Sequence, residues 1–341
     1  MAHRFPPPSK DSAVPYAEQP RILTVTLNPA VDISLRVRQL VSGGKNRAEV
    51  GSVQGGGGGI NVSRCLARLG VPSVALHTAG GEVGARLNRL LDEEGLAHVA
   101  VGIEGQTREA IVVDDEWSGH SYHVVPPGPR LSAAEESAVG SAIAEAMAEH
   151  SYLILTGSAT PGLRADFSAD VLHRAHAGGI RAVLDIAGAQ LRAALREKSF
   201  LIRLDRKEAG GLIDRPIEVF DDARAANDVV LGMAATDHVI TTAGPLGAVY
   251  SDRDHHYEIS APPLTAPARS DACAGDSLVA AVTARLSAGD SCARACAYGV
   301  AAAAATVMLP GTAVFDRAAI DRLATGVEVR RIERLSQPAA Q

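Results

Sequence analysis

An aspartate close to the predicted start of a late helix could take part in the transfer of a charged group. The segment Ala274-Gly275-Asp276-Ser277 precedes apolar residues that recur at helical spacing from Leu278 to Leu286. Backbone amides and the helix dipole at such a turn stabilise negative charge, as on a phosphoryl group in transit. Asp276 could there accept or orient the proton of an attacking hydroxyl group. Because Asp is also a favoured N-cap residue, the segment alone leaves a purely structural role open.

A run of glycines near the N-terminus forms a second candidate site. Residues 55–59 carry no side chains and lead directly into a helical pattern that contains Asn61. A ligand can approach such a backbone closely, the helix N-terminus favours an anion, and the Asn61 amide can bind sugar hydroxyls. A flexible linker is the alternative, but a linker rarely continues straight into a well-patterned helix. Neither a Walker A lysine nor a strand–GxGxxG–helix unit followed by a suitable acidic residue is present.

Short apolar runs alternate with amphipathic helical patterns from Arg21 onward. This alternation predicts a single α/β domain over residues 21–328, with a largely parallel sheet covered by helices on both faces. The expected strands are residues 22–27, 73–79, 152–156, 181–186 and 238–242. The expected helices are residues 60–69, 83–94, 163–177, 190–195, 276–286, 292–307 and 317–323.

Two stretches interrupt this alternation. Residues 32–54 and 99–125 alternate polar and apolar side chains without a good intervening helix. They predict a small antiparallel sheet that stands off the main body as a lid over an active site. The proline-rich and charged residues 1–20 are predicted to be a flexible tail, and residues 329–341 a C-terminal tail.

The composition argues against several classes of protein. The 341 residues are 46% hydrophobic and 21% charged, with a dispersed net charge of −6, so no basic nucleic-acid-binding face is expected. The longest apolar run, residues 300–309, is about half as long as a membrane-spanning helix. Cys65, Cys273, Cys292 and Cys296 form no CxxC pair or metal-ligand pattern. We expect them to be reduced thiols in a cytoplasmic protein.

Taken together, the two motifs resemble the phosphofructokinase B branch of the ribokinase-like carbohydrate kinases. That branch includes 6-phosphofructokinases of type 2, 1-phosphofructokinases and tagatose-6-phosphate kinases. The glycine run ends in Gly-Ile-Asn-Val, and the late segment reads Ala-Gly-Asp-Ser. Further matches follow in the same order within residues 21–325: Thr26-Leu27-Asn28-Pro29-Ala30-Val31-Asp32, Lys45 with Arg47, Thr107-Arg108, Thr156-Gly157-Ser158 with Pro161-Gly162, and Thr242-Ala243-Gly244-Pro245-Leu246-Gly247-Ala248.

The resemblance implies a three-layer α/β/α ribokinase-like fold with a mostly parallel central sheet and a small antiparallel β lid. In this family the lid often mediates contacts between two copies of the chain, so a homodimer is expected. A phosphorylated sugar would lie between the lid and the glycine run, and Mg-ATP would lie beside the C-terminal helices. K⁺ is a further candidate cofactor, and neither nucleic acid nor a membrane is an expected partner.

The resemblance also assigns roles to individual residues. Those assigned to the sugar phosphate are Asp32, Lys45, Gly57, Gly58, Asn61, Arg108 and Ser158. Those assigned to catalysis are Asp276, as the base, with Cys273, Ala274 and Gly275 beside it. Those assigned to the nucleotide are Arg203, Asp205, Thr242, Gly244 and Gly247, and Glu208 is assigned to the metal.

The expected reaction is ATP-dependent phosphorylation of fructose 6-phosphate to fructose 1,6-bisphosphate. An anionic sugar phosphate needs cations, which Lys45, Arg47 and Arg108 could supply through charge-assisted hydrogen bonds. Activity as a 1-phosphofructokinase or a tagatose-6-phosphate kinase is the alternative, because the choice of hydroxyl depends on the placement of the sugar.

Three residues depart from the pattern of the family. Cys273 replaces a glycine, Asp271 stands where Thr or Ser is usual, and Asp205 replaces an asparagine. The added side chain could narrow the anion site, and the added negative charges could repel ATP phosphates. These departures motivate an alternative of another class, a catalytically weak sensor that binds a sugar phosphate or a nucleotide.

Overall fold

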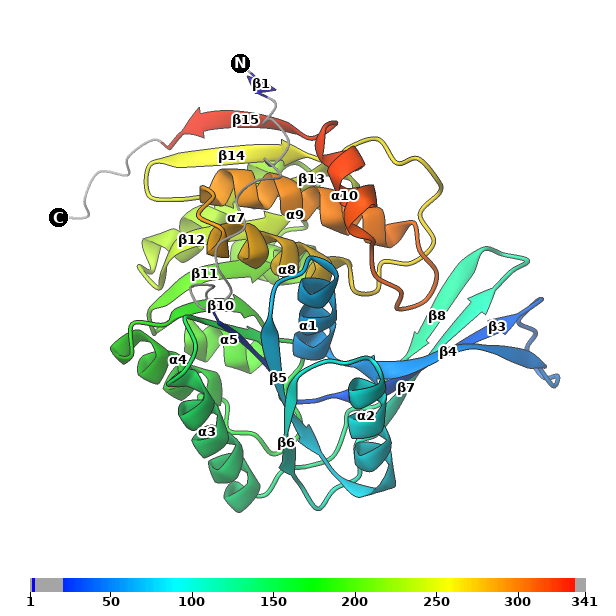
Figure 1. Cartoon of the computed structure of the whole chain (residues 1–341). Helices are drawn as coiled ribbons and strands as arrows, with labels where there is room; N and C mark the ends of the chain where they lie inside the picture. The colour runs from blue at the N-terminus through cyan, green and yellow to red at the C-terminus, as the bar shows by residue number, and fades with distance from the viewer. Residues whose placement is uncertain (1, 4–20, 335–341) are drawn as a thin grey trace.

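The computed structural model describes residues 2–3 and 21–334, and eleven strands of this described part form one main sheet (Figure 1). These strands are β1 (Ala2–His3), β2 (Ile22–Thr26), β5 (Ser73–Ala79), β6 (His98–Gly102), β9 (Tyr152–Thr156), β10 (Arg181–Asp185), β11 (Ser199–Leu204), β12 (Thr236–Thr242), β13 (Gly247–Ser251), β14 (His255–Ser260) and β15 (Glu328–Glu333). Their order across the sheet is β1-β15-β14-β13-β12-β11-β10-β9-β2-β5-β6. Neighbours from β6 to β12 are parallel, and those from β12 to β1 are antiparallel. The mostly parallel sheet predicted from the sequence is confirmed.

Helices cover both faces of this sheet and give the predicted three layers (Figure 1). One face carries α1 (Gly58–Arg68), α2 (Gly81–Glu93), α8 (Ala274–Ser287), α9 (Cys292–Val307) and α10 (Arg317–Ala324). The other face carries α3 (Ala133–Met147), α4 (Phe167–Ala177), α5 (Gly188–Ala194), α6 (Arg206–Ile213) and α7 (Phe220–Gly232). Strands β2 and β9 are buried along their whole length, because helices exclude water from both sides.

The pair α8 and α9 is held together by small side chains. Both helices are rich in buried alanine, and Gly299 of α9 lies where an added Cβ would come within 2.7 Å of Val282 in α8. This close packing fixes α8, and therefore the residues at its N-terminus, relative to the sheet.

A second sheet stands off the main body (Figure 1). Its strands are β3 (Ala30–Val37), β4 (Ala48–Gly56), β7 (Arg108–Asp115) and β8 (His120–Val124), in the order β4-β3-β7-β8. The two outer pairs are antiparallel, as predicted, whereas the central pair β3–β7 is parallel. The expected lid segment 99–125 also starts too early, since His98–Gly102 is β6 of the main sheet and pairs with β5.

The two faces of the lid differ in polarity. Cross-strand partners share a face, and the row Leu35, Val50, Val113 and Tyr122 is apolar from edge to edge. On the opposite face, Asp32 pairs with Gln54 of β4, and Asp114 of β7 pairs with Ser121 of β8. The register therefore gives the lid one polar face and one apolar face.

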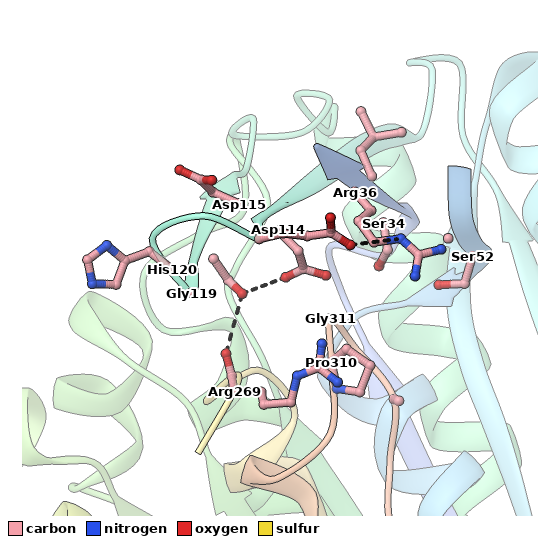
Figure 2. Close-up of a pocket in the computed structure, with 15 residues that line it drawn as sticks. Ser34, Arg36, Ser52, Asp114, Asp115, Gly119, His120, Arg269, Pro310 and Gly311 are labelled. Atoms are coloured by element: carbon pink, nitrogen blue, oxygen red, sulfur yellow. Dashed lines mark hydrogen bonds and ion pairs between the residues drawn. The ribbon is translucent and has the colours of Figure 1, made fainter. Parts of the chain in front are cut away.

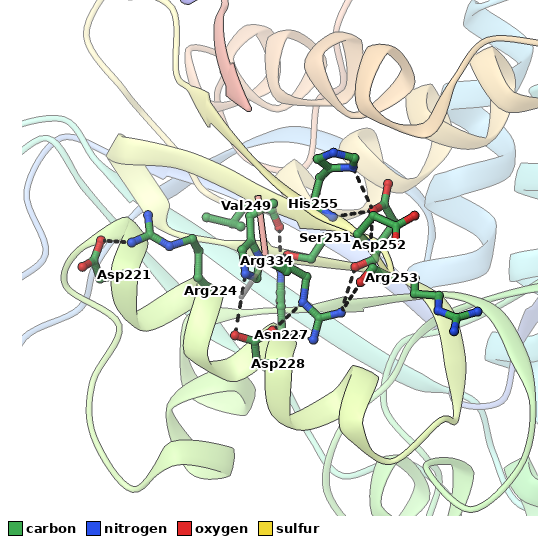
Figure 3. Close-up of polar contacts among 12 residues, drawn as sticks. Asp221, Arg224, Asn227, Asp228, Val249, Ser251, Asp252, Arg253, His255 and Arg334 are labelled. Atoms are coloured by element: carbon green, nitrogen blue, oxygen red, sulfur yellow. Dashed lines mark hydrogen bonds and ion pairs between the residues drawn. The ribbon is translucent and has the colours of Figure 1, made fainter. Parts of the chain in front are cut away.

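The C-terminal strand belongs to the main sheet, so the tail predicted from residue 329 is wrong up to Glu333. Strand β15 pairs with β14, and Arg334 just beyond it is tied to the body (Figure 3). The Arg334 Nε atom donates to Asp228 Oδ1 at 2.7 Å, and its Nη1 donates to the carbonyl oxygens of Asp252 and Arg253. This strand was not predicted, because polar and apolar residues alternate over only a few positions. It is held in the sheet by its pairing with β14. The predicted flexible tail at residues 1–20 lies outside the described residues except for β1, as do residues 335–341.

Within the described residues, none of the helices combines the length and the hydropathy that a membrane span requires.

The side chain of Asn227 connects α7 to strands β12 and β13 of the main sheet by hydrogen bonds. Its side chain is fully buried; Nδ2 donates to the Val249 carbonyl oxygen and to Ser251 Oγ, and Oδ1 accepts from Thr241 Oγ1 (Figure 3). Replacement Asn227→Ala removes three buried hydrogen bonds and leaves Thr241 Oγ1 without this acceptor, so we expect the free energy of unfolding to fall by about 2–3 kcal/mol in urea denaturation. The exposed control Asp237→Ala should change it by less than about 0.5 kcal/mol. Equal losses in the two variants would contradict this assignment.

Candidate active site

The two sequence motifs meet at the carboxyl edge of the sheet. Asn61 lies in the first turn of α1 and Asp276 in the first turn of α8, and Asn61 Nδ2 donates to Asp276 Oδ2 at 2.9 Å. Residues that are 215 positions apart in the sequence thus share one hydrogen bond. Because both side chains come from helix N-termini, the positive ends of two helix dipoles point to the same place, which favours an anionic ligand.

The glycine run is packed tightly and is therefore no flexible linker. An added Cβ at Gly56 would overlap the carboxylate of Asp32, and one at Gly58 would come within 2.7 Å of Thr156 Oγ1. Gly57, the N-cap of α1, has a φ of 108°, which side chains other than glycine rarely allow. The absence of side chains lets strand β4, the lid aspartate and helix α1 approach one another.

Burial controls the charge of both candidate carboxylates. The pKa of Asp276 is raised to about 7, first by burial and then by the carboxylate of Asp185, whereas the hydrogen bond from Asn61 and the charge of Arg203 oppose the rise. Burial likewise raises the pKa of Asp32 to about 6, against the lowering effect of two neighbouring arginines. A carboxylate whose pKa is close to neutral can accept a proton and release it again.

Cys273 is the N-cap of α8, the helix whose N-terminus the sequence predicts to be an anion site. Cys273 takes up a φ of 59°, in the left-handed region, and its Sγ lies 3.7 Å from the carbonyl oxygen of Thr312. The thiol is therefore directed at a neighbouring loop. Gly275 lies against the Arg203 guanidinium, since an added Cβ there would come within 2.9 Å of Arg203 Nη1. The amide-lined turn Ala274-Gly275 thus has an arginine beside it.

Arg203 is buried and fixed by two partners at the ends of neighbouring strands. Its Nη1 donates to Asp185 Oδ1 at 2.8 Å and its Nη2 to Thr242 Oγ1 at 2.9 Å, while its Nε is a buried donor without a partner among the described residues. Asp185 also accepts from Thr156 Oγ1 at 3.3 Å. The residues thus come from the carboxyl ends of β9, β10, β11 and β12, where ligands of open parallel sheets usually bind.

Further residues that the resemblance assigns to the nucleotide and the metal lie just after strands β11 and β12. Gly244 has a φ of 60° and lies against the Arg206 side chain, and Gly247 has a φ of 120° at the start of β13. Asp205 is the N-cap of α6, and its Oδ1 accepts from the backbone amides of Lys207 and Glu208. Its role as the N-cap of α6 therefore accounts for an aspartate at position 205.

Glu208 completes this capping box, because its Oε2 accepts from the amide of Asp205 at 2.8 Å. Burial, followed by the charges of Asp205 and Asp185, raises the pKa of Glu208 to about 7. The carboxylate therefore lies in an environment with excess negative charge, which a cation would relieve. The described residues contain no cluster of three or more His, Cys, Asp or Glu side chains that could hold a metal ion alone.

Arg108 of β7 lies beside Asn28 and Ser158. Its Nη2 donates to the carbonyl oxygen of Asn28 at 2.8 Å and lies 3.5 Å from Ser158 Oγ, and its Nη1 donates to the Pro126 carbonyl oxygen. Asn28 itself donates to the Pro127 carbonyl oxygen at 2.9 Å. The structure thus brings Arg108 and Ser158 together, as the resemblance implies.

Lys45 lies far along the lid from Asp32. It is exposed in the loop between β3 and β4, beyond the pair Val37 and Ala48, while Asp32 lies at the opposite end of the hairpin. The five steps along the strand from Asp32 to Val37 alone span about 17 Å. Within one chain, Lys45 therefore lies far from Asp32.

A cavity of about 570 Å³ lies between the polar face of the lid and loops of the main body (Figure 2). Ser34 and Arg36 line it from β3, Asp114 from β7, and Arg269 and Gly311 from loops of the main body. Figure 2 shows the lid residues on one side of this space and the loop residues on the other. The lid is thus separated from the body by a space large enough for a small ligand.

Sequence reasoning gave no role to three charged residues of this region. Asp185 lies next to the end of the predicted strand 181–186 and is the last residue of β10. Because the carboxyl ends of parallel strands meet at one edge of a sheet, this position could have identified it as a site residue. Arg64 follows Asn61 by three positions and donates to Asn61 Oδ1 at 2.9 Å, a spacing that places both on one helix face. Glu94, which binds Arg64, had no sequence signal because it lies 30 positions away.

Comparison with known proteins agrees with this geometry. The model of the pfkB family of carbohydrate kinases matches residues 25–318. This chain belongs to the pfkB family. It is therefore a sugar kinase, a phosphotransferase that acts on an alcohol group, as the sequence predicts.

Individual relatives extend over most of the chain. The ATP-dependent 6-phosphofructokinase isozyme 2 of Escherichia coli (strain K12) is 32% identical over 293 residues, which cover 86% of this chain and 94% of the relative. The enzyme with the same name from Mycobacterium tuberculosis (strain ATCC 25618 / H37Rv) is 32% identical over 304 residues and 89% of both chains. The crystal structure of phosphofructokinase-2 from E. coli in complex with potassium superposes with a TM-score of 0.83 at 31% identity, covering 89% of this chain and 98% of that one. The same enzyme has also been solved in a tetrameric inhibited form, which superposes with a TM-score of 0.80 at 31% identity and the same coverage.

The left-handed conformation of Cys273 leads to a stability prediction for this pfkB kinase. A residue other than glycine is strained there, so Cys273→Gly should have a free energy of unfolding about 1 kcal/mol higher than Cys273→Ala. Both variants lose the thiol, and only glycine relieves the backbone, so the alanine variant is the matched control. Urea denaturation of the two proteins measures the difference; equal stabilities would argue against strain at this position.

Proposed function

We propose that this kinase transfers the γ-phosphoryl group of ATP to fructose 6-phosphate and forms fructose 1,6-bisphosphate and ADP. The observation that carries the proposal is the contact between Asn61 and Asp276 at two helix N-termini. It supports a single site where an acceptor hydroxyl and a phosphoryl group can meet. The substrate assignment is favoured by the 32% identity to ATP-dependent 6-phosphofructokinase isozyme 2 from two organisms.

In the proposed reaction, a hydroxyl oxygen of the sugar attacks the γ-phosphorus while the bond to the bridging oxygen of ADP breaks. The hydroxyl proton passes to a carboxylate oxygen of Asp276 and from there to solvent. The amides of Gly275 and Asp276 and the Arg203 guanidinium would stabilise negative charge on the phosphoryl group in transit. Asn61 would hold the carboxylate in place by its hydrogen bond.

The sugar phosphate is proposed to lie against the glycine run. Asp32 would accept hydrogen bonds from sugar hydroxyls, and the open backbone at Gly57 and Gly58 would allow the ring to approach. Arg108 and Ser158 would bind the phosphate group of the sugar. The unpaired, buried Nε of Arg108 supports this role, because it is a donor that finds no partner within the described residues.

ATP is proposed to bind along the strand ends that carry Arg203, Asp205, Thr242, Gly244 and Gly247. Magnesium fits this region, since Mg²⁺ keeps several waters and takes one or two carboxylates besides the phosphates of its substrate. Glu208 has one carboxylate oxygen that is free of the capping box. When bound, the ion would neutralise charge on the ATP phosphates.

Further cofactors and the place of action follow the same reasoning. Potassium is proposed as an additional cation, because the relative from E. coli has been crystallised in complex with it. All four cysteines are free, which favours the cytoplasmic location expected from the sequence.

A homodimer formed through the lid is also proposed. The apolar face of the lid carries exposed Val50, Tyr122 and Val124, with exposed fractions of 65%, 43% and 58%. Such a surface favours burial against a second copy of the chain. Lys45 would then contribute to a site only from a partner.

The role of Asp276 is tested by Asp276→Asn, a replacement of similar shape that cannot take up the proton. We expect kcat to fall about 10²- to 10⁴-fold, with KM for both substrates much less affected. In the unmodified enzyme only the ionised carboxylate is active, so kcat/KM should rise with pH through a limb centred near pH 7. Steady-state kinetics between pH 5.5 and 8.5, roughly the range over which such a carboxylate titrates, measure both effects. Full activity of Asp276→Asn would rule out the base.

The identity of the substrate is tested by release of ADP from fructose 6-phosphate, fructose 1-phosphate and tagatose 6-phosphate, with magnesium and potassium present. We expect the highest kcat/KM for fructose 6-phosphate. Arg108→Ala should raise KM for it about 10- to 100-fold, because a charge-assisted bond to phosphate is lost, whereas Arg331→Ala on β15 should leave KM unchanged. Binding without turnover of any of the three sugars would favour the sensor instead.

A further inference from the structure

Arg64 is a charged residue in the interior of the molecule. It lies on α1, one turn after Asn61, and only 6% of its surface is exposed. Arginine is seldom buried to this degree unless its guanidinium is fully paired. Here the pairing is extensive: Nε and Nη2 donate to the two carboxylate oxygens of Glu94 at 2.7 and 3.0 Å, and Nη2 also donates to the Gly55 carbonyl oxygen.

The remaining donor of Arg64 determines which way the Asn61 amide points. Arg64 Nη1 donates to Asn61 Oδ1 at 2.9 Å, and Asn61 Nδ2 donates to Asp276 Oδ2 at 2.9 Å. A guanidinium can only donate hydrogen bonds. If the amide rotated by half a turn, its NH₂ group would face the guanidinium and its oxygen would face the carboxylate. Arg64 therefore keeps the donor end of Asn61 directed at Asp276.

Glu94 keeps Arg64 in this position. It is the C-cap of α2, and its side chain is 28% exposed, so it can hold the guanidinium in two-point contact from the adjacent helix. The bond to Gly55 ties the same guanidinium to the start of the glycine run. One side chain thus connects α2, the glycine run and the amide that reaches the proposed base.

We propose that Arg64, anchored by Glu94, is a positioning residue that orients the Asn61 amide and through it the carboxylate of Asp276. The inference rests on the proposed function of Asp276 as the base that receives the hydroxyl proton. The partners of Arg64 among the described residues are Glu94, Gly55 and Asn61, so it acts on Asp276 through Asn61.

Replacement Arg64→Met retains the length of the side chain and removes its donors. We expect kcat to fall about 10- to 100-fold, with KM for fructose 6-phosphate changed much less. Without Arg64, the Asn61 amide is no longer held and donates less well to the carboxylate. The loss of this hydrogen bond favours the protonated acid, so the acidic limb of the kcat/KM profile should move to higher pH.

The other groups that face Asp276 are unchanged in this variant. They are Asp32 on β3, Asp185 at the end of β10, Arg203 on β11, and the thiols of Cys65 and Cys273. The matched control is Arg68→Met, an exposed arginine one turn further along α1 whose Nη1 lies 3.5 Å from the Phe315 carbonyl oxygen. This control should retain the kcat and the pH profile of the unmodified enzyme.

A double-mutant cycle separates positioning from general support of the fold. If Arg64 acts through Asn61, then Arg64→Met should reduce kcat less than about 3-fold in an Asn61→Ala background. Equal losses in the two backgrounds, or an acidic limb that does not move, would overturn the inference. Because loss of a buried arginine can prevent folding, Glu94→Gln provides a second route: it weakens the anchor at a more exposed position and should shift the limb in the same direction by a smaller amount.

The outcomes for Arg64 and for Asp276 are distinguishable. An inactive Asp276→Asn together with additive losses at Arg64 and Asn61 would overturn only the positioning role. A fully active Asp276→Asn would overturn the proposed base and the positioning role with it.

Discussion

The site depends on the meeting of two helix N-termini at one edge of a parallel sheet. Helix α1 follows the glycine run and α8 follows Cys273, and the first turns of both approach closely enough for Asn61 to bind Asp276. Small residues make this approach possible: glycines before α1 allow β4 and Asp32 to pack against it, and alanines fix α8 on α9. Two helix dipoles then point at the same volume, which suits an enzyme that stabilises a moving negative charge.

The same approach collects several charges where little water is present. Asp32, Asp185 and Asp276 lie near the arginines Arg64 and Arg203, and burial raises the pKa of Asp32 and of Asp276. Each arginine has carboxylate partners that hold it: Glu94 binds Arg64, and Asp185 binds Arg203. The pKa of the proposed base, Asp276, is therefore set by opposing effects of burial and of neighbouring charges and hydrogen bonds.

Two of the departures from the family pattern have a structural account. Cys273 adopts a left-handed backbone conformation and directs its thiol at Thr312, so the position retains the conformation that favours glycine while carrying a side chain. Asp205 caps α6 and shares a capping box with Glu208, which an aspartate does at least as well as an asparagine. Asp271 is exposed, and its carbonyl oxygen accepts from the amide of Ala274; nothing in the structure explains its carboxylate.

Local patterns of residues were enough to predict the layers of the fold and the two helix starts of the candidate site. Alternating apolar runs predict the strands of a parallel sheet, and residues adjacent in the chain define each helix start, after the glycine run and beside Asp276. Which distant side chains lie around these helix starts follows from the packing of the fold. The pairing of Arg64 with Glu94, the placement of Asp185 beside Arg203 and the distance of Lys45 from Asp32 are set by how helices and strands pack. Such contacts join residues that are far apart in the chain, so no local repeat of residue types in the sequence reveals them.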